Sequence, residues 1–389
     1  MRNWLLPEYI EDVLPHEAAR VEALRAALLE NFRTHGYELI APPMLEYLES
    51  LLTGTGHDMD LRTFKLVDQL SGRMMGIRAD ITPQAARIDA HLLNRDTVTR
   101  LCYCGTVLHT RPRAMDVTRE PLQIGAEIYG HAGIESDLEI QRLLYSTLAA
   151  CGLPRARLDV GHVGIFRAIC RRGDIDAGLE AELHEALEAK DLPALASLVK
   201  PLSAEVREAL LPLPDLYGDP SVLDRAEKLL PHDAEIARAL GDLRRLVRDN
   251  HFELSIDLAD LRGYHYHSGV VFTAYVPGAS RAVALGGRYD EIGKAFGRSR
   301  AATGFSMDLR VLAELAPARG ERGAIRAPWI ATDGGTDAHP AREAALAAEV
   351  SRLRGMGEVV IRALPGARDG ENCERELVPS GDIWTIRKI

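Results

Sequence analysis

Two strand-like segments joined by a charged loop constrain the fold of this chain more than any other feature. The segments are Thr99–His109 and Leu122–Tyr129. On the second segment, Gln123 and Glu127 are four residues apart, so their side chains lie on one face of a strand and both can reach one pocket. Because an unpaired buried glutamate is costly, spacing alone favours a Glu127 that faces solvent or pairs with an arginine. A ligand pocket is the alternative.

Further strand-like segments occur on both sides of this pair, with long helical patterns between some of them. This order lacks the regular strand–helix–strand alternation of a parallel sheet, so it predicts an α+β fold with a mostly antiparallel sheet and helices packed on it. The further segments are Arg62–Asp68, Arg73–Arg78, Glu253–Ala259, Gly269–Tyr275 and Ser280–Leu285.

An amphipathic helix is predicted near the N-terminus, over residues 17–35. Apolar residues recur there at helical spacing, and Gly36 suits the helix C-cap. Residues 37–40 then predict a strand. From the pattern alone this is either a core helix leading into an edge strand or an element through which two copies pair.

The sequence predicts two domains, the first of which contains an insertion. Residues 1–325 form the predicted core domain, and residues 171–250 within it are rich in Leu, Ala, Glu and Arg and cut by five prolines, which predicts an all-helical insertion. Residues 326–389 predict a small C-terminal α/β unit, whose size is marginal for an independent core. Its expected elements are a strand at Pro328–Thr332, a helix at Pro340–Arg354, and strands at Glu358–Arg362 and Asp382–Arg387.

Composition excludes few functions. The chain has 389 residues, of which 46% are hydrophobic and 27% charged, as in ordinary soluble globular proteins. It contains no apolar run long enough to span a membrane, and Pro7 and acidic residues interrupt the N-terminus where a signal peptide would be apolar, so we expect a cytoplasmic protein. A net charge of −10 without a basic block argues weakly against a nucleic-acid partner.

The cysteines do not predict a metal site. Cys102 and Cys104 form a C-x-C pair on one predicted strand, which is half of a possible site. No second cysteine pair or nearby Cys/His pair completes it, so buried reduced thiols are expected, with no metal or other cofactor.

The stretch from Arg100 to Gly130 resembles motif 2 of the class II aminoacyl-tRNA synthetases, most of all the histidyl enzyme. In that family the first strand supplies an arginine for the ATP α-phosphate, and the matching position here is His109. The second strand matches the family's histidine-binding face. The resemblance implies that Gln123 contacts the amino-acid backbone, that Glu127 accepts a hydrogen bond from an imidazole nitrogen, and that Arg119 matches a loop arginine.

The segment from Arg78 to Gln84 resembles the part of the histidyl enzyme that holds the substrate α-ammonium group. Asp80 and Thr82 occupy the matching positions, with Asp in place of the usual Glu. A carboxylate and a hydroxyl suit a cation that needs charge-assisted hydrogen bonds. Either residue could instead cap the helix predicted at Gln84–His91; we expect Thr82 to cap it and Asp80 to be freer for a ligand.

The segment Leu261–His267 resembles the histidine-specific signature R-G-L-D-Y-Y. The resemblance places Arg262 near the substrate carboxylate and Tyr266 at the first tyrosine, whereas His267 replaces the tyrosine that contacts the imidazole. His265 and His267 could alternatively ligate a metal, but no carboxylate or cysteine at ligand spacing supports this. A histidine in place of the tyrosine predicts a different affinity and pH response.

Two later segments resemble the family's G-G-R-Y-D and motif 3. The first contains Tyr289, and the second runs from Thr303 to Arg310. The motif 3 arginine that would clamp the ATP γ-phosphate is Val311 here, and Arg310 is one position away, which rotates it by about 100° around a helix. Both phosphate arginines are therefore replaced, and adenylate formation is not expected, because it depends on positioned charge.

Taken together, residues 1–325 resemble the family of ATP phosphoribosyltransferase regulatory subunits, histidyl-tRNA synthetase paralogues without aminoacylation activity. The resemblance implies a hetero-oligomer with a short catalytic phosphoribosyltransferase chain in the first step of histidine biosynthesis, feedback regulation by L-histidine, and a homodimer formed through the motif 1-like region at residues 17–48. The alternatives are an active histidyl-tRNA synthetase with unusual ATP contacts, or a paralogue that binds another amino acid. The predicted histidine-binding residues are Asp80, Thr82, Arg119, Gln123, Glu127, Arg262, Tyr266, His267 and Tyr289.

Overall fold

The computed structural model divides into two compact units, Met1–Pro317 and Ala318–Ile389. The boundary predicted between residues 325 and 326 falls inside strand β13 (Ala324–Ala327). The residues that the structure describes are 5–54, 57–112, 117–264, 266–317, 323–331, 339–366, 373–381 and 383–389.

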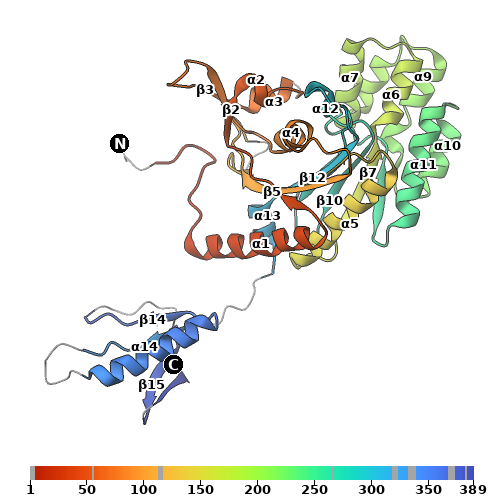
Figure 1. Ribbon diagram of the computed structural model, residues 1–389. Coiled ribbons are helices and arrows are strands. Elements are labelled where there is room, and N and C mark those ends of the chain that lie inside the picture. The colour runs from red at the N-terminus through yellow and green to blue at the C-terminus, as the bar shows by residue number, and fades with distance from the viewer. Residues whose placement is uncertain are drawn as a thin grey trace. The chain divides into compact units, whose positions relative to one another are not determined.

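The centre of the first unit is a sheet of nine strands in the described residues (Figure 1). Six of the neighbouring pairs are antiparallel, and the parallel ones are β1 with β5 and β7 with β9. This confirms the predicted α+β fold with a mostly antiparallel sheet. In sheet order the strands are β1 (Glu38–Leu39), β5 (Thr99–Thr106), β6 (Leu122–Tyr129), β12 (Ala302–Asp308), β11 (Ala284–Arg288), β10 (Val270–Tyr275), β7 (Arg157–His162), β9 (Leu254–Asp257) and β8 (Tyr217–Gly218).

Helices cover both faces of this sheet (Figure 1). On one face lie α1 (Pro15–Thr34), α5 (Ile134–Ala150) and α13 (Leu309–Leu315), which share one large apolar core with the even-numbered residues of β6. On the other face, α4 (Thr82–Arg87) and the π-helix η1 (Ile88–Leu93) cover a smaller core. The odd-numbered residues of β6, including Glu127, face this second side, because side chains alternate along a strand.

The predicted N-terminal helix forms α1. Its apolar positions Val21, Leu24, Leu28 and Phe32 are all buried in the large core. Gly36 follows the helix with φ +85°, a left-handed conformation that glycine adopts at little cost. The chain then forms β1 at the edge of the large sheet.

A separate small sheet of three described strands lies between β1 and α4 in the sequence. Its strands are β2 (Leu45–Tyr47), β4 (Met74–Ile77) and β3 (Phe64–Val67), all antiparallel. We predicted a strand from Arg62 to Asp68, but Arg62 is the last residue of a helix and the strand begins at Phe64. The short helices of this unit outside the insertion are α2 (Leu48–Leu51), α3 (His57–Arg62) and α12 (Ile292–Ala295).

The insertion is helical, as its composition predicts, except for β8 at the end of the large sheet. The five prolines lie in helix first turns or in the connections between helices. The helix before the insertion is α6 (Val163–Arg172). The insertion contains α7 (Ala177–Glu188), α8 (Leu192–Leu198), α9 (Ala204–Leu210), the 3-10 helix η2 (Leu213–Asp215), α10 (Val222–Leu229) and α11 (Ala234–Asp249).

The second unit is a sheet of four described strands with one helix. Its helix α14 (Pro340–Gly355) matches the predicted one, and its small core includes Leu346, Leu353 and Leu377. The strand predicted at residues 328–332 lies instead at β13; residues 328–331 are not in a strand, and residue 332 is outside the described residues. The other strands are β14 (Val360–Arg362), β15 (Cys373–Ser380) and β16 (Ile383–Lys388).

Several strands were missed or misplaced because their pairing is set by tertiary partners. The strands not predicted are β2, β7, β8, β12 and β15, although β7, β12 and β15 each lie between two other strands. β12 contains Gly304 in its middle, which weakens a strand pattern. The strand predicted at Ser280–Leu285 is shifted to β11, which ends at Arg288.

Candidate functional site

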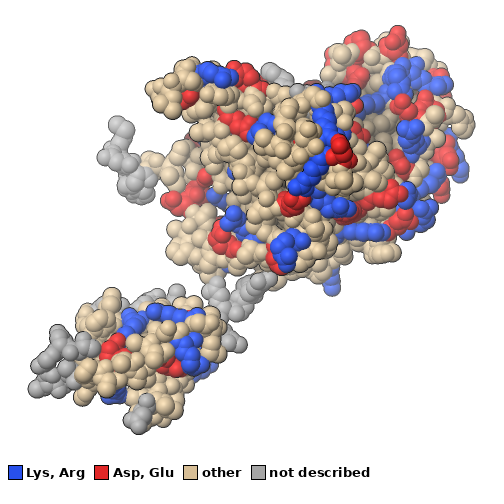
Figure 2. Space-filling model, in the orientation of Figure 1, with Lys and Arg blue, Asp and Glu red and all other residues tan. Residues whose placement is uncertain are grey.

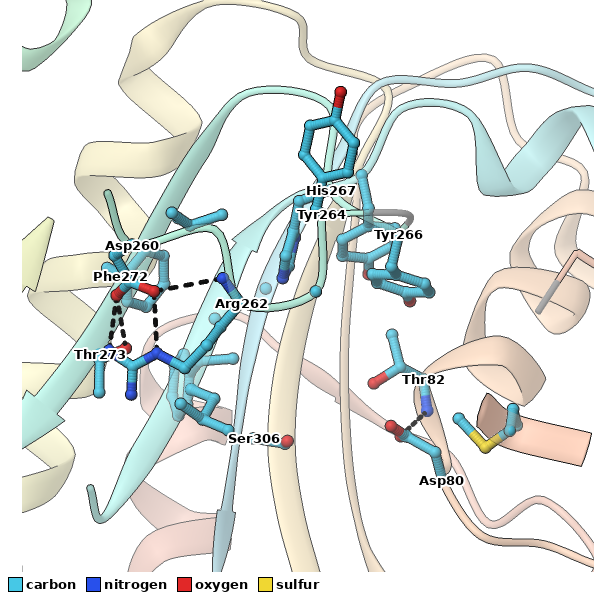
Figure 3. A pocket seen from close by; sticks show the side chains of 18 of the residues that line it. Asp80, Thr82, Asp260, Arg262, Tyr264, Tyr266, His267, Phe272, Thr273 and Ser306 are labelled. Carbon is cyan, nitrogen blue, oxygen red and sulfur yellow. Dashed lines mark hydrogen bonds and ion pairs between the residues drawn. The ribbon is translucent and has the colours of Figure 1, made fainter. Parts of the chain in front are cut away.

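The main candidate site is a cavity of about 360 Å³ on the α4 side of the large sheet. Its walls come from β6, β10, β11 and β12, from Gly54 and α3, from the start of α4, from the loop around Asp260–Tyr264, and from α7 of the insertion. Figure 3 shows Asp80 and Thr82 on one side of this cavity, Arg262 and Ser306 on the other, and Tyr266 above. The predicted residues that line it are Asp80, Thr82, Glu127, Arg262, Tyr266, His267 and Tyr289.

Glu127 is the most buried charged group of this cavity, with 1% of its surface exposed. The Tyr103 hydroxyl donates to Glu127 Oε1 over 2.9 Å, and the Thr82 hydroxyl donates to the same oxygen over 3.2 Å. The Tyr289 hydroxyl donates to Oε2. Glu127 therefore neither faces solvent nor pairs with an arginine, and three hydroxyl groups satisfy it.

Two glycines make room for this cluster. Gly304 lies opposite Glu127 in the β6–β12 register, and a Cβ there would lie 1.6 Å from Glu127 Oε2. Gly125 lies between Gln123 and Glu127 on the same strand face, and a Cβ there would lie 2.6 Å from the Tyr103 hydroxyl. The glycines at positions 125 and 304 are thus a steric requirement of the buried carboxyl cluster.

Burial sets the protonation of the cluster. It raises the pKa of Glu127 from 4.5 to about 8, against the lowering effect of hydrogen bonds from Tyr289 and Tyr103. Burial, followed by the charge of Glu127, also raises the pKa of Tyr103 and Tyr289 well above 10. The tyrosines therefore stay hydrogen-bond donors at neutral pH. Glu127 titrates near neutrality, so it can hold a proton or accept a hydrogen bond from a ligand N–H.

Neither Asp80 nor Thr82 is the N-cap of α4, because the helix begins at Thr82 and Ile81 occupies the N-cap position. Asp80 Oδ1 accepts a hydrogen bond from the Thr82 backbone N–H over 2.9 Å. The Thr82 hydroxyl instead points to Glu127 and to Tyr103, whose hydroxyl is 2.9 Å away. The prediction that Thr82 caps the helix was wrong because its hydroxyl has a buried carboxylate within reach.

Gln123 organises this region without lining the main cavity. Its Nε2 donates to Asp80 Oδ1 over 2.9 Å, and its Oε1 accepts from the Ile81 backbone N–H over 2.9 Å. Both ends of the amide are used to hold the turn at residues 80–82 against β6. The side chain lines a second cavity instead.

Arg262 is held at the opposite wall by a bidentate ion pair. Its Nε and Nη2 donate to Asp260 over 2.8 and 2.6 Å, and its Nη1 donates to the Tyr275 hydroxyl over 3.2 Å. Although burial opposes it, the hydrogen bond and charge of Asp260 raise the pKa of Arg262. The guanidinium is therefore a fixed, permanent cation that still has N–H groups for a ligand carboxylate.

Tyr266 and His267 form the upper wall. Their rings are edge to face with centroids 5.4 Å apart, and the Tyr266 ring lies 5.0 Å from that of Tyr289. The Tyr266 hydroxyl oxygen is buried without a hydrogen-bond partner among the described residues. Burial lowers the pKa of His267 to about 4, so its ring is neutral at physiological pH. His265, its predicted companion in the metal alternative, lies outside the described residues.

A second cavity of about 330 Å³ lies beside the first and shares Arg262, Leu285 and Ser306 with it. His109 and Val311, the two positions where the family resemblance expects phosphate arginines, both line this cavity. His109 is 2% exposed, and its Nε2 lies 2.9 Å from the Ala79 carbonyl oxygen. The second cavity is thus lined by an imidazole and an isopropyl group at those positions.

Other arginines lie near these positions: Arg262 and Arg281 line the second cavity, and Arg62 Nη2 lies 3.2 Å from His109 Nε2. Two arginines that the sequence singles out, Arg310 and Arg119, lie outside both cavities. Arg310 is absent from the residues that line either cavity, and its guanidinium lies 3.7 Å from Glu120. Arg119 lines neither cavity; its Nε donates to the His109 carbonyl oxygen over 3.0 Å, and its guanidinium lies over the Phe64 ring. The structure therefore leaves Arg119 outside the cluster formed by the other predicted residues.

Several residues of the site had no clear signal in the sequence. Tyr103 binds Glu127 and Asp260 binds Arg262. The β5–β6 strand register brings the first pair together, and the loop conformation the second. Ser306 points into the cavity from β12 (Figure 3). His184 and Glu188 come from the insertion, which sequence patterns did not connect with the site. In β12, small residues (Gly304 and Ser306) alternate with large apolar ones (Phe305 and Met307), and this pattern could have indicated a strand.

Other classes of site have no counterpart in the described part of the chain. No group of three or more His, Cys, Asp or Glu side chains there could hold a metal ion. None of the helices described is long and apolar enough to cross a membrane. On the face seen in Figure 2, basic and acidic side chains alternate over the helical insertion rather than forming one basic patch.

Comparison with known proteins identifies the family of this chain. A family model described as histidyl-tRNA synthetase matches residues 9–312, and one described as the ATP phosphoribosyltransferase subunit HisZ C-terminal domain matches residues 322–387. The ATP phosphoribosyltransferase regulatory subunit of Ralstonia pickettii is 56% identical over 389 residues, covering 99% of this chain and 98% of that protein. The one of Burkholderia multivorans is 56% identical, with 99% of both chains covered.

The chain belongs to the family of ATP phosphoribosyltransferase regulatory subunits. This confirms the family predicted from the sequence. A solved structure from Bacillus halodurans, described as an ATP phosphoribosyltransferase regulatory subunit/histidyl-tRNA synthetase, superimposes with a TM-score of 0.82 at 26% identity and 95% coverage of both chains. Histidyl-tRNA synthetase from Nostoc shares the fold, with a TM-score of 0.79 at 17% identity, 100% coverage of this chain and 95% of that one.

Proposed function

We propose that this chain is the non-catalytic subunit of an ATP phosphoribosyltransferase, acting with a short catalytic chain in the first step of histidine biosynthesis. We also propose that L-histidine binds in the Glu127 cavity and regulates the complex. The observation that carries the proposal is the contrast between a complete polar cluster around Glu127 and the loss of both phosphate arginines at His109 and Val311.

The cavity supplies a partner for each polar group of histidine. Glu127 suits an imidazole nitrogen, and the Tyr266 hydroxyl offers a further donor or acceptor close to it. Asp80 Oδ1 already accepts two hydrogen bonds, so we assign Oδ2, together with Thr82, to the α-ammonium group. We assign the ligand carboxylate to Arg262, whose fork geometry suits it.

Regulation requires that histidine bind one quaternary arrangement more tightly than another. A ligand shifts such an equilibrium only by its difference in affinity for the two states, and a coupling of about 1–3 kcal/mol is typical. By the same linkage, the catalytic chain must change the affinity for histidine by an equal factor.

Dimerisation through the motif 1-like region is part of the proposal. β1 pairs with β5 on one side and ends the large sheet there, and its Leu39 is 59% exposed. Met44, Leu45 and Tyr47 are exposed close by in sequence. An exposed strand edge beside apolar side chains is a surface that a second copy can cover. Light scattering of the purified chain tests this, and a monomer at micromolar concentration would contradict it.

An active histidyl-tRNA synthetase is the second candidate, because the histidyl-tRNA synthetase family model covers residues 9–312. Histidine-dependent exchange of pyrophosphate into ATP tests it. The proposed function predicts no exchange above background, since His109 can offer one donor and Val311 none. Clear exchange would replace the regulatory proposal with the synthetase one.

Two experiments test the proposed function. The first is co-purification with a short catalytic phosphoribosyltransferase, followed by activity measurements with and without histidine. A catalytic chain that is fully active and histidine-sensitive alone would overturn it. The second is calorimetry with a panel of amino acids, where preference for another amino acid over histidine would contradict the assigned ligand.

A further inference from the structure

The helical insertion reaches the candidate site through one face of α7. Glu180, His184 and Glu188 are spaced at i, i+4 and i+8, so they share one face of the helix. Leu183 and Leu187 occupy its buried apolar face in the large core. His184 and Glu188 line the Glu127 cavity directly. A surface helix of an insertion therefore directs a polar row at the ligand site.

The first contact of this row is with Tyr264, in the loop that carries Arg262, Tyr266 and His267. The Tyr264 hydroxyl donates to Glu180 Oε1 over 2.5 Å. The Tyr264 ring packs against His184 with centroids 5.2 Å apart and against Phe166 of α6 at 5.3 Å. Burial, followed by its hydrogen bond to Glu180, raises the pKa of Tyr264, so the hydroxyl keeps its proton at neutral pH.

Two more contacts tie the backbone of this loop to the helices. Arg167 of α6 donates to the Tyr264 carbonyl oxygen over 2.7 Å, and His184 Nε2 lies 3.1 Å from the Leu261 carbonyl oxygen. Within the loop, the Tyr264 N–H donates to Leu261 over 2.9 Å and the Tyr266 N–H donates to Gly263 over 2.8 Å. Hydrogen bonds of the turn itself thus connect Tyr264 and Tyr266 to the residues on either side of Arg262.

We propose that α7 is a wall of the ligand site that responds to its occupancy, and that Tyr264 is the positioning residue linking the helix to Arg262 and Tyr266. This inference rests on the proposed binding of histidine. It gives the insertion a role in regulation: a ligand that engages the loop stabilises one position of α7, and α7 packs on α8 within the insertion.

Hydrogen exchange of the full chain with and without saturating histidine tests the link. The expected result is slower exchange on histidine binding both in the loop at residues 258–269 and in residues 177–188. The helix α10, which lines neither cavity, serves as the internal reference and should not change. Unchanged exchange in residues 177–188 at saturating histidine would overturn the inference.

A double-mutant cycle measures the link in solution. Tyr264→Phe keeps the packed ring and removes the hydroxyl, and Glu180→Ala removes the acceptor from a half-buried position. Each is expected to weaken histidine binding about 3–10-fold, and the double variant no more than either single one, since all three lose the same hydrogen bond. Glu180→Gln keeps an accepting oxygen and should bind more nearly like the wild type.

Glu182→Gln, on the exposed face of the same helix, is the matched control and should bind histidine like the wild type. Equal affinity of the wild type and Tyr264→Phe, or additive effects in the double variant, would overturn the role of Tyr264. If the wild type binds no histidine at all, the proposed function fails together with this inference. If it binds histidine and only the variant and exchange results are absent, the inference fails alone.

Discussion

The two neighbouring cavities of the larger unit share Arg262, Leu285 and Ser306 but differ in chemistry. The first is built around a buried carboxyl group whose oxygens accept three hydroxyl hydrogen bonds. The second presents His109 and Val311 where the histidyl-tRNA synthetase resemblance expects arginines. The difference teaches that a synthetase-like fold can hold a buried polar cluster in one cavity while the neighbouring cavity has no arginine at the two positions where the resemblance expects one.

The strands of the β5–β6 pair carry this contrast within one hairpin. His109 lies beyond the end of β5, and its ring nitrogen Nε2 contacts the Ala79 carbonyl oxygen rather than being directed only at the cavity. On β6, Gln123 and Glu127 are both buried. Gln123 holds the turn at residues 80–82, and Glu127 lines the first cavity. The following predictions test how separate the two cavities are.

The largest effect is expected from Glu127→Ala. The substitution removes the proposed imidazole partner, and leaving a buried polar group without its partner costs about 1–3 kcal/mol, so histidine affinity should fall by about tenfold to a hundredfold. Calorimetry on the purified chain measures it, with light scattering to show that the oligomeric state is retained. Unchanged affinity would remove Glu127 from the site and with it the contrast between the cavities.

Gly304→Ala should destabilise the fold by about 2–3 kcal/mol, because the new methyl group meets both Glu127 Oε2 and the Ala126 carbonyl oxygen, 2.7 Å from the Cβ position. Urea unfolding measures the change. Gly241→Ala is the matched control: this glycine lies within α11, nothing lies within 4 Å of an added Cβ, and the substitution should stabilise the protein by about 0.5–1 kcal/mol. A tolerated Gly304→Ala would show that the carboxyl cluster is loosely packed.

The raised pKa of Glu127 predicts a pH dependence of stability. Between its ordinary value of 4.5 and about 8, folded Glu127 keeps a proton that the unfolded chain has released. The free energy of unfolding therefore falls as pH rises through this window, by up to about 1.4 kcal/mol per pH unit from this group. Urea unfolding at pH 5 to 8 should show that Glu127→Gln loses this slope. Parallel curves for the two proteins would mean that the carboxyl ionises normally.

The smallest effect is expected from Val311→Ala, which enlarges the second cavity only. Val311 lines that cavity and not the first, so histidine affinity should stay within about twofold of the wild type. Calorimetry under the same conditions as for Glu127→Ala checks it. A large loss of affinity would show that the two cavities act as one site.

Sequence patterns predicted much of this molecule where local signals agree with tertiary packing. The prediction of α1 held because its periodic apolar positions are also the buried ones. The prediction of β6 held although the strand is buried on both faces from Gln123 onward. Patterns failed where partners decide: β12 has a glycine at its centre because Glu127 fills the space opposite. The predicted capping role of Thr82 failed for the same reason, because local sequence rules do not include the Glu127 carboxyl group on another strand that binds its hydroxyl. The link from α7 to Tyr264 depends on contacts 84 residues apart in sequence.

The most direct test of the account is the histidine sensitivity of the reconstituted complex with a short catalytic phosphoribosyltransferase. The histidine concentration for half-inhibition is compared among complexes containing the wild-type chain, Glu127→Ala or Val311→Ala. The account predicts inhibition of the wild-type and Val311→Ala complexes at similar concentrations, and at least a tenfold higher concentration for Glu127→Ala. Equal sensitivity of all three complexes would contradict it, because histidine would then act at a site other than the Glu127 cavity.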